Sequence, residues 1–160
     1  MYAGTSFKHA LHEGQPPSFK RARHCHPNAP SAAAPSARCE LSAPACRQLL
    51  QNADTMEEAL DALLCHNQLL HSYCHLEEGP FFYLTYALAH AIRGSTVDLT
   101  AKCLHVMQLV VYRVPGASVR LKATGVQTYI HHATFLYPCL QALGNNLVQT
   151  IDSASAPTGA

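Results

Sequence analysis

Residues 123–151 read ATGVQTYIHHATFLYPCLQALGNNLVQTI, and this stretch contains no Asp, Glu, Lys or Arg. Apolar residues recur in it every three or four positions with polar residues between them, which is the periodicity of amphipathic helices. The apolar face consists of Val126, Ile130, Ala133, Tyr137, Leu140, Leu143, Leu147 and Ile151. The stretch is too polar, and too broken by Pro138 and Gly144, to span a bilayer. We therefore predict packed helices with an uncharged surface, which a protein partner can cover at a low desolvation cost.

The composition fits one small domain. The chain has 160 residues, and its hydrophobic content of 48% is sufficient for one core. Charged residues make up only 13%, and the net charge of +1 gives no field that would attract nucleic acid or an anionic membrane. The seven cysteines are odd in number and lack the spacing of a secreted disulfide framework, so we expect mostly reduced thiols.

The start of the chain predicts its location and its first boundary. No charged and apolar segment of a secretory signal is present, so we expect an intracellular protein of the nucleus or cytoplasm. Residues 1–42 are rich in Pro, Ser, Ala and His, a composition typical of a flexible arm. Within this arm Lys20, Arg21 and Arg23 form a short basic patch of the kind used for nuclear targeting. A helical domain over 43–152 and a flexible tail over 153–160 follow.

Start and stop signals divide the domain into helices. Thr55 to Glu58 matches a capping box, Gly79 followed by Pro80 separates two helices, and Gly125 interrupts a later one. After a short turn or helix at 46–50, the predicted helices cover about 55–77, 80–94, 96–114, 117–136 and 138–152. This pattern predicts an all-α fold, a compact bundle or small irregular array of about four to five helices with a disordered N-terminal arm.

The predicted helix at 96–114 leaves two questions open. The β-branched run from Val110 to Tyr112 also allows a strand. Leu104 and Val111 lie off the main apolar stripe, so we expect the N-terminal segment or another chain to cover them.

A cluster of histidine and cysteine on the predicted helix 55–77 is a candidate metal site. His71 and His75 stand one turn apart with Cys74 beside them, and imidazole nitrogen and thiolate sulfur are ligands that Zn²⁺ prefers. The alternative is that Cys74 belongs to the apolar stripe and that the helix binds no metal.

Aromatic residues crowd the start of the predicted helix 80–94. If Phe81 and Leu84 enter the core, then Phe82, Tyr83 or Tyr86 must lie at the surface, where aromatic side chains often anchor a protein partner. The alternative is a helix that is buried on most of its sides.

Catalytic motifs are missing from the sequence. It contains no Gly-rich phosphate loop, no nucleophile elbow and no His-Glu-x-x-His, so we do not expect an enzyme or a cofactor. We expect a non-enzymatic helical protein-protein interaction module, an adaptor or accessory protein that can pair as a homodimer. The alternative hypothesis is a zinc protein that uses His71, Cys74 and His75.

Overall fold

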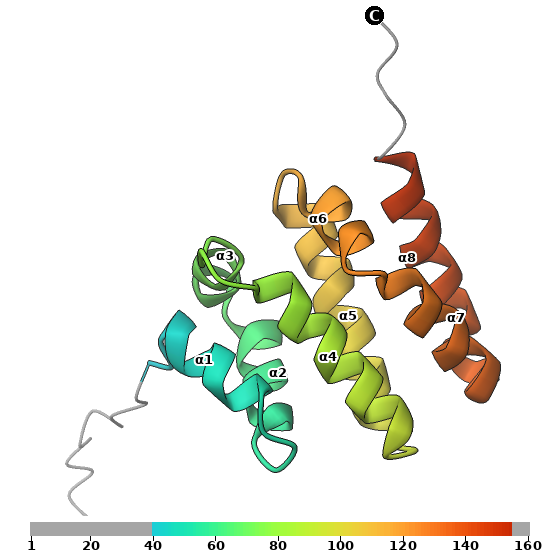
Figure 1. Ribbon diagram of the computed structural model, residues 1–160, viewed down its shortest axis with the longest axis horizontal. Coiled ribbons are helices and arrows are strands. Elements are labelled where there is room, and N and C mark those ends of the chain that lie inside the picture. The colour runs from blue at the N-terminus through green and yellow to red at the C-terminus, as the bar shows by residue number, and fades with distance from the viewer. Residues whose placement is uncertain (1–39, 155–160) are drawn as a thin grey trace, which may run out of the picture. The chain divides into compact units, whose positions relative to one another are not determined.

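The computed structural model describes residues 40–154, which form eight α-helices, one 3₁₀ turn and no strand (Figure 1). The elements are α1 (Ala43–Leu50), α2 (Met56–Cys65), α3 (Asn67–Cys74), α4 (Pro80–Arg93), α5 (Val97–Arg113), α6 (Ala117–Ala123), α7 (Val126–Leu136), η1 (Pro138–Leu140) and α8 (Gln141–Ser153). The all-α prediction is confirmed for this part of the chain. The predicted number of four to five helices is wrong, because two predicted helices are each divided in two and because the short segment predicted at 46–50 is a full helix, α1.

The predicted helix 55–77 breaks at His66, which has an extended backbone with φ −122° and ψ 99°. In an unbroken helix, at about 100° per residue, Leu69 would lie roughly 140° around the axis from Met56. In α3 the buried side chains are those of Leu69, Leu70, Tyr73 and Cys74. Leu70 and Cys74 keep the phase of the apolar stripe on α2, whereas Leu69 lies off it, so α3 buries a wider face than that stripe alone.

Gly125 ends the first half of the predicted helix 117–136 as a left-handed residue with φ 72°, so that α6 and α7 are separate helices. Glycine adopts this conformation without the steric cost that a Cβ adds. The last predicted helix begins at Pro138 with the 3₁₀ turn η1 and continues as α8.

The capping box predicted at Thr55 does not form. Thr55 precedes α2 in a right-handed backbone conformation, whereas a capping side chain needs an extended one to reach the first-turn amides. Its hydroxyl instead donates to the Leu49 carbonyl oxygen at 3.0 Å and ties the end of α1 to the start of α2. A side-chain cap is found at α1, where the Ser42 hydroxyl accepts from the Ala45 amide at 3.3 Å.

Helix α4 is the central element of the core. It packs against α1, α5, α6 and α7, and Figure 1 shows it crossing in front of α5. Its buried residues cover most of its circumference: Pro80, Phe81, Leu84, Thr85, Ala87, Leu88, Ala89, Ala91 and Ile92. Only a narrow strip of α4 is left at the surface.

Helix α5 corrects two expectations. The run from Val110 to Tyr112 lies inside this helix, so the strand alternative is wrong. Leu104 is fully buried in the core that residues 40–154 themselves form, and it needs no other segment to cover it.

Helices α7 and α8 lie side by side and meet at Gly144 (Figure 1). A Cβ built on Gly144 would collide with Cγ2 of Thr134 and would lie 3.2 Å from Cγ2 of Ile130. The missing side chain therefore lets the two helices approach closely.

Other predictions concern the chain ends and the membrane. The basic patch and nearly all of the predicted arm lie outside the described residues, as does most of the predicted tail, so both domain boundaries stay predictions. Within residues 40–154 no helix combines the length and the apolar character that crossing a membrane requires.

Candidate partner-binding surface

The surface strip of α4 carries the predicted aromatic residues. Phe82 is 59% exposed and Tyr86 is 37% exposed, one helical turn apart. Tyr83 is partly buried against the core, and its ring meets the Phe82 ring edge-on with the centroids 5.5 Å apart. The structure thus separates the three predicted residues into two exposed side chains and one that supports them.

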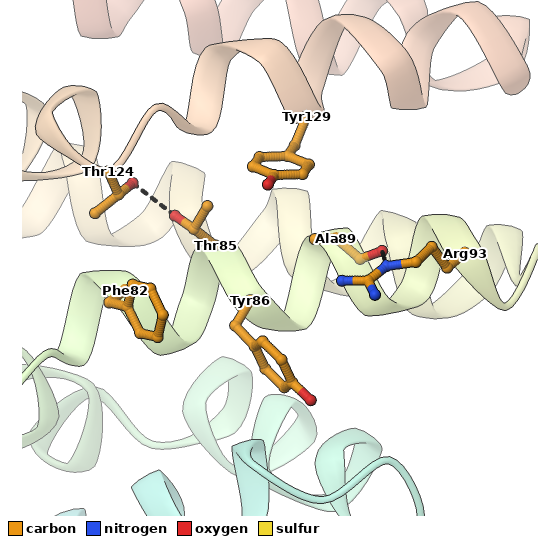
Figure 2. Close-up of a pocket in the computed structure, with 7 residues that line it drawn as sticks. All are labelled: Phe82, Thr85, Tyr86, Ala89, Arg93, Thr124 and Tyr129. Carbon is orange, nitrogen blue, oxygen red and sulfur yellow. Dashed lines mark hydrogen bonds between the residues drawn. The ribbon is translucent and has the colours of Figure 1, made fainter.

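A small pocket lies between this strip and helix α7 (Figure 2). Its volume is about 120 Å³, and its lining consists of Phe82, Thr85, Tyr86, Ala89, Arg93, Thr124 and Tyr129. We call it the α4–α7 pocket. Figure 2 shows Tyr129 pointing from α7 toward α4, and this ring is 38% exposed. Three aromatic side chains that are partly open to solvent therefore share one hollow.

Two threonines form a polar wall of the pocket. Thr85 and Thr124 place their hydroxyl oxygens 2.7 Å apart, although the residues are separated by 39 positions in the sequence. The Thr124 hydroxyl donates to the Leu121 carbonyl oxygen at 2.7 Å, and the Thr85 hydroxyl lies 3.0 Å from the Phe81 carbonyl oxygen. This network joins α4 to the turn between α6 and α7 and fixes the geometry of that wall.

Arg93 contributes the charge of the pocket. It is the last residue of α4, and its Nε donates to the Ala89 carbonyl oxygen at 3.4 Å. The seven lining residues include no carboxylate, imidazole or thiol. The pocket therefore offers aromatic contact, hydroxyls and one guanidinium, all of which can contact a partner's side chain.

The uncharged surface predicted for residues 123–151 continues beside the pocket. On α7 Phe135 is 82% exposed and Leu136 is 43% exposed. Helices α7 and α8 have no Asp, Glu, Lys or Arg before Asp152. Tyr129 belongs to this region and could have been singled out, because it lies off the apolar face formed by Val126, Ile130 and Ala133. Tyr129, Arg93 and the two threonines come together only because α4 packs against the distant helix α7. No local sequence pattern predicts that packing.

The structure does not bring the predicted metal ligands together. The His71 and His75 rings stack with their centroids 4.2 Å apart, and Nδ1 of His75 donates to the His71 carbonyl oxygen at 2.8 Å. Cys74 is buried on the apolar stripe and points into the core. In residues 40–154 no three side chains of His, Cys, Asp or Glu are placed to hold one metal ion.

The environment of Cys74 also disfavours a thiolate ligand. Burial raises the pKa of this thiol to about 12, while the nearby Arg120 guanidinium acts in the opposite direction. A metal ion needs the deprotonated sulfur, so that much proton affinity works against binding. Arg120 itself donates to the Cys74 carbonyl oxygen at 3.3 Å and stacks on the Phe81 ring at 4.3 Å, which places a fixed positive charge beside the predicted site.

No protein-family model matches the chain, and neither a curated protein nor a solved structure shows significant similarity to it. The geometry of residues 40–154 therefore carries the functional argument.

Proposed function

We propose that this chain is a non-enzymatic helical interaction module, which binds a partner protein by accepting one of its side chains in the α4–α7 pocket. The observation that carries this proposal is the grouping of Phe82, Tyr86 and Tyr129 around one hollow. Aromatic side chains on a rigid frame are the residues that most often dominate the free energy of protein association.

The size of the pocket supports a side chain as its occupant. Sites for small molecules and cofactors commonly measure about 300–1,000 Å³. The α4–α7 pocket is smaller, with a volume of about 120 Å³. This size suits one aliphatic or aromatic side chain of a partner.

The surroundings of the pocket lower the cost of association. Helix α7 has no Asp, Glu, Lys or Arg, and α4 has one such residue, Arg93. A partner that covers this surface therefore removes little charge from water, and taking charge out of water is costly. A second copy of the chain is the simplest partner that meets this description, so the proposal includes a homodimer.

Site-directed photocrosslinking in living cells tests the proposal. A photoreactive phenylalanine analogue at position 82 should crosslink to a protein, and adding Tyr129→Ser should abolish the product. Tyr112 on α5 is the matched control position, because it is a comparably exposed aromatic residue at 62%. Equal crosslinking from both positions, or a product that persists after Tyr129→Ser, would contradict the proposal. Light scattering on the purified chain then shows whether the partner is a second copy.

A further inference from the structure

The α4–α7 pocket has two chemically different ends, and this difference limits what it can bind. The hydroxyl pair of Thr85 and Thr124 lies at one end, near Phe82, and the Arg93 guanidinium lies at the other end (Figure 2). The rings of Tyr86 and Tyr129 lie between the two ends. An occupant must match each of these groups, because a buried polar group that loses its water without gaining a partner costs free energy.

The threonine end has its own hydrogen bonds. The two hydroxyls have two protons, and three short contacts share them: the contact between the hydroxyls and one contact from each hydroxyl to a backbone carbonyl. In this arrangement both protons are used inside the wall, and lone pairs of the hydroxyl oxygens remain available to an occupant. A hydroxyl that turns to donate to an occupant gives up one of these contacts.

The arginine end donates and has no anion of its own. Among residues 40–154 Arg93 forms no ion pair, whereas Lys102 lies 2.7 Å from Glu57 and Lys122 lies 2.8 Å from Asp152. Its Nε donates to Ala89, and the two terminal nitrogens of the guanidinium have no acceptor among residues 40–154. A planar guanidinium of this kind recognises a carboxylate through two parallel hydrogen bonds.

The spacing along α4 sets the distance between the two contacts of the occupant. Tyr86 and Arg93 are seven residues apart, which is about 10 Å along a helix axis. A partner helix lying across the mouth of the α4–α7 pocket would therefore present its apolar anchor and its carboxylate about two turns apart. Helices that bind in grooves use this kind of periodic anchor.

We propose that the occupant is an acidic amphipathic helix of a partner protein, which inserts one apolar side chain between Tyr86 and Tyr129 and pairs an Asp or Glu with Arg93. This inference rests on the proposed function and adds the chemistry of the partner. A single cation in uncharged surroundings does not suit a polyanion such as nucleic acid, which needs several Lys or Arg contacts.

Peptide selection on the purified full chain tests the inference. A phage library of 16-residue peptides is selected on the wild-type chain and depleted on the variant that combines Phe82→Ser with Tyr86→Ser. The peptides that remain depend on the pocket. The tightest of them is synthesised together with a version in which each Asp or Glu is replaced by Asn or Gln, and fluorescence anisotropy gives the Kd of both.

The amide version should bind the wild-type chain about tenfold more weakly, as expected for loss of one charge-assisted pair. For the Arg93→Gln variant the acidic and the amide peptide should have almost the same Kd. For Arg93→Lys part of the difference in Kd between the two peptides should return. Arg113→Gln is the matched control, because Arg113 is also an exposed arginine at the last position of a helix. This variant should bind both peptides as the wild type does.

The two proposals fail in different ways. Pocket-dependent peptides without carboxylates, or an unchanged Kd for the amide version, would overturn the acidic partner and leave the interaction module standing. A library that yields no peptide dependent on Phe82 and Tyr86 would overturn both.

Discussion

Surface ion pairs link helices α2 and α5, whereas helices α7 and α8 pack closely because Gly144 has no side chain. Lys102 of α5 reaches Glu57 at 2.7 Å and Asp61 at 2.8 Å on α2, all at the surface. At Gly144 the backbone of α8 instead contacts the side chains of α7 directly. Surface ion pairs contribute little stability and lose it in salt, while close packing is sensitive to every added carbon atom. The uncharged half of the domain should therefore tolerate fewer substitutions at its helix crossing.

The largest effect is expected from filling the α7–α8 crossing. Gly144→Leu should destabilise the fold by about 3 kcal/mol, because the added side chain has to displace Thr134 and Ile130. Urea unfolding followed by circular dichroism measures the change. Gly94→Leu is the matched control, since Gly94 is exposed, has a φ of −73° and has its nearest neighbour at 3.5 Å. Equal losses for the two variants would show that the crossing is not tight.

The crossing can also be tested by a compensating change. Gly144→Ala adds only the Cβ that meets Cγ2 of Thr134, and Thr134→Ser removes that carbon while keeping the hydroxyl. The double variant should be more stable than Gly144→Ala alone by about 1 kcal/mol. Additive effects of the two substitutions would contradict the proposed contact.

Two tyrosine hydroxyls provide the next comparison. Tyr73 is fully buried, and its hydroxyl donates to the Pro80 carbonyl oxygen at 2.7 Å, whereas the buried hydroxyl of Tyr137 has no hydrogen-bond partner among residues 40–154. Tyr73→Phe should cost about 1–2 kcal/mol because it leaves a buried carbonyl oxygen unpaired. Tyr137→Phe should cost nothing or stabilise the fold slightly. Thermal unfolding of both variants checks this, and the reverse order would place an unseen partner at Tyr137.

The ion pairs between α2 and α5 should give a smaller effect. Lys102→Met should lower the free energy of unfolding by less than about 1 kcal/mol. Hydrogen bonds to Asp61 and Glu57 raise the pKa of Lys102, so this contribution is present at neutral pH and is lost only as the pH rises past the ordinary value of 10.5. Urea unfolding at low and at high NaCl concentration should show the difference between variant and wild type shrinking with salt.

Asp152, which follows the uncharged stretch, should have the smallest effect, and only in acid. Hydrogen bonds from Lys122 and then Gln127 lower the pKa of Asp152 below its ordinary value of 3.8. A lowered carboxyl pKa stabilises the fold above the ordinary value and loses this contribution as the pH falls below it. Asp152→Asn should therefore narrow the stability difference between neutral and acidic pH. A pH titration of the melting temperature that is identical for variant and wild type would contradict this.

Local sequence features predicted those parts of the fold that local physics determines. The helix start at Pro80 and the interruption at Gly125 follow from the backbone preferences of proline and glycine, and the structure has both. The break at His66 was missed, because His66 has no helix-breaking side chain and because Leu70 and Cys74 keep the phase of the stripe on α2. Leu69, which is buried although it lies off that stripe, is the local sign of the break.

Only the residues that α4 exposes could be predicted for the pocket. Phe82 and Tyr86 were singled out because one helix face cannot bury so many aromatic side chains. Tyr129 and Arg93 complete the pocket only through the packing of α7 against α4. The predicted metal cluster had suitable spacing along one helix, but Cys74 is buried, and within residues 40–154 no three such side chains are placed to hold a metal ion.

The reactivity of the native cysteines can report local unfolding of individual helices. Cys46 on α1, Cys74 on α3 and Cys103 on α5 are buried, and desolvation raises the pKa of each thiol to about 12, whereas Cys65 and Cys139 are exposed. An alkylating reagent should modify the exposed pair quickly and each buried thiol only when its own helix separates from the core. Alkylation rates resolved by mass spectrometry would thus show the order in which three helices leave the native state, without any engineered probe.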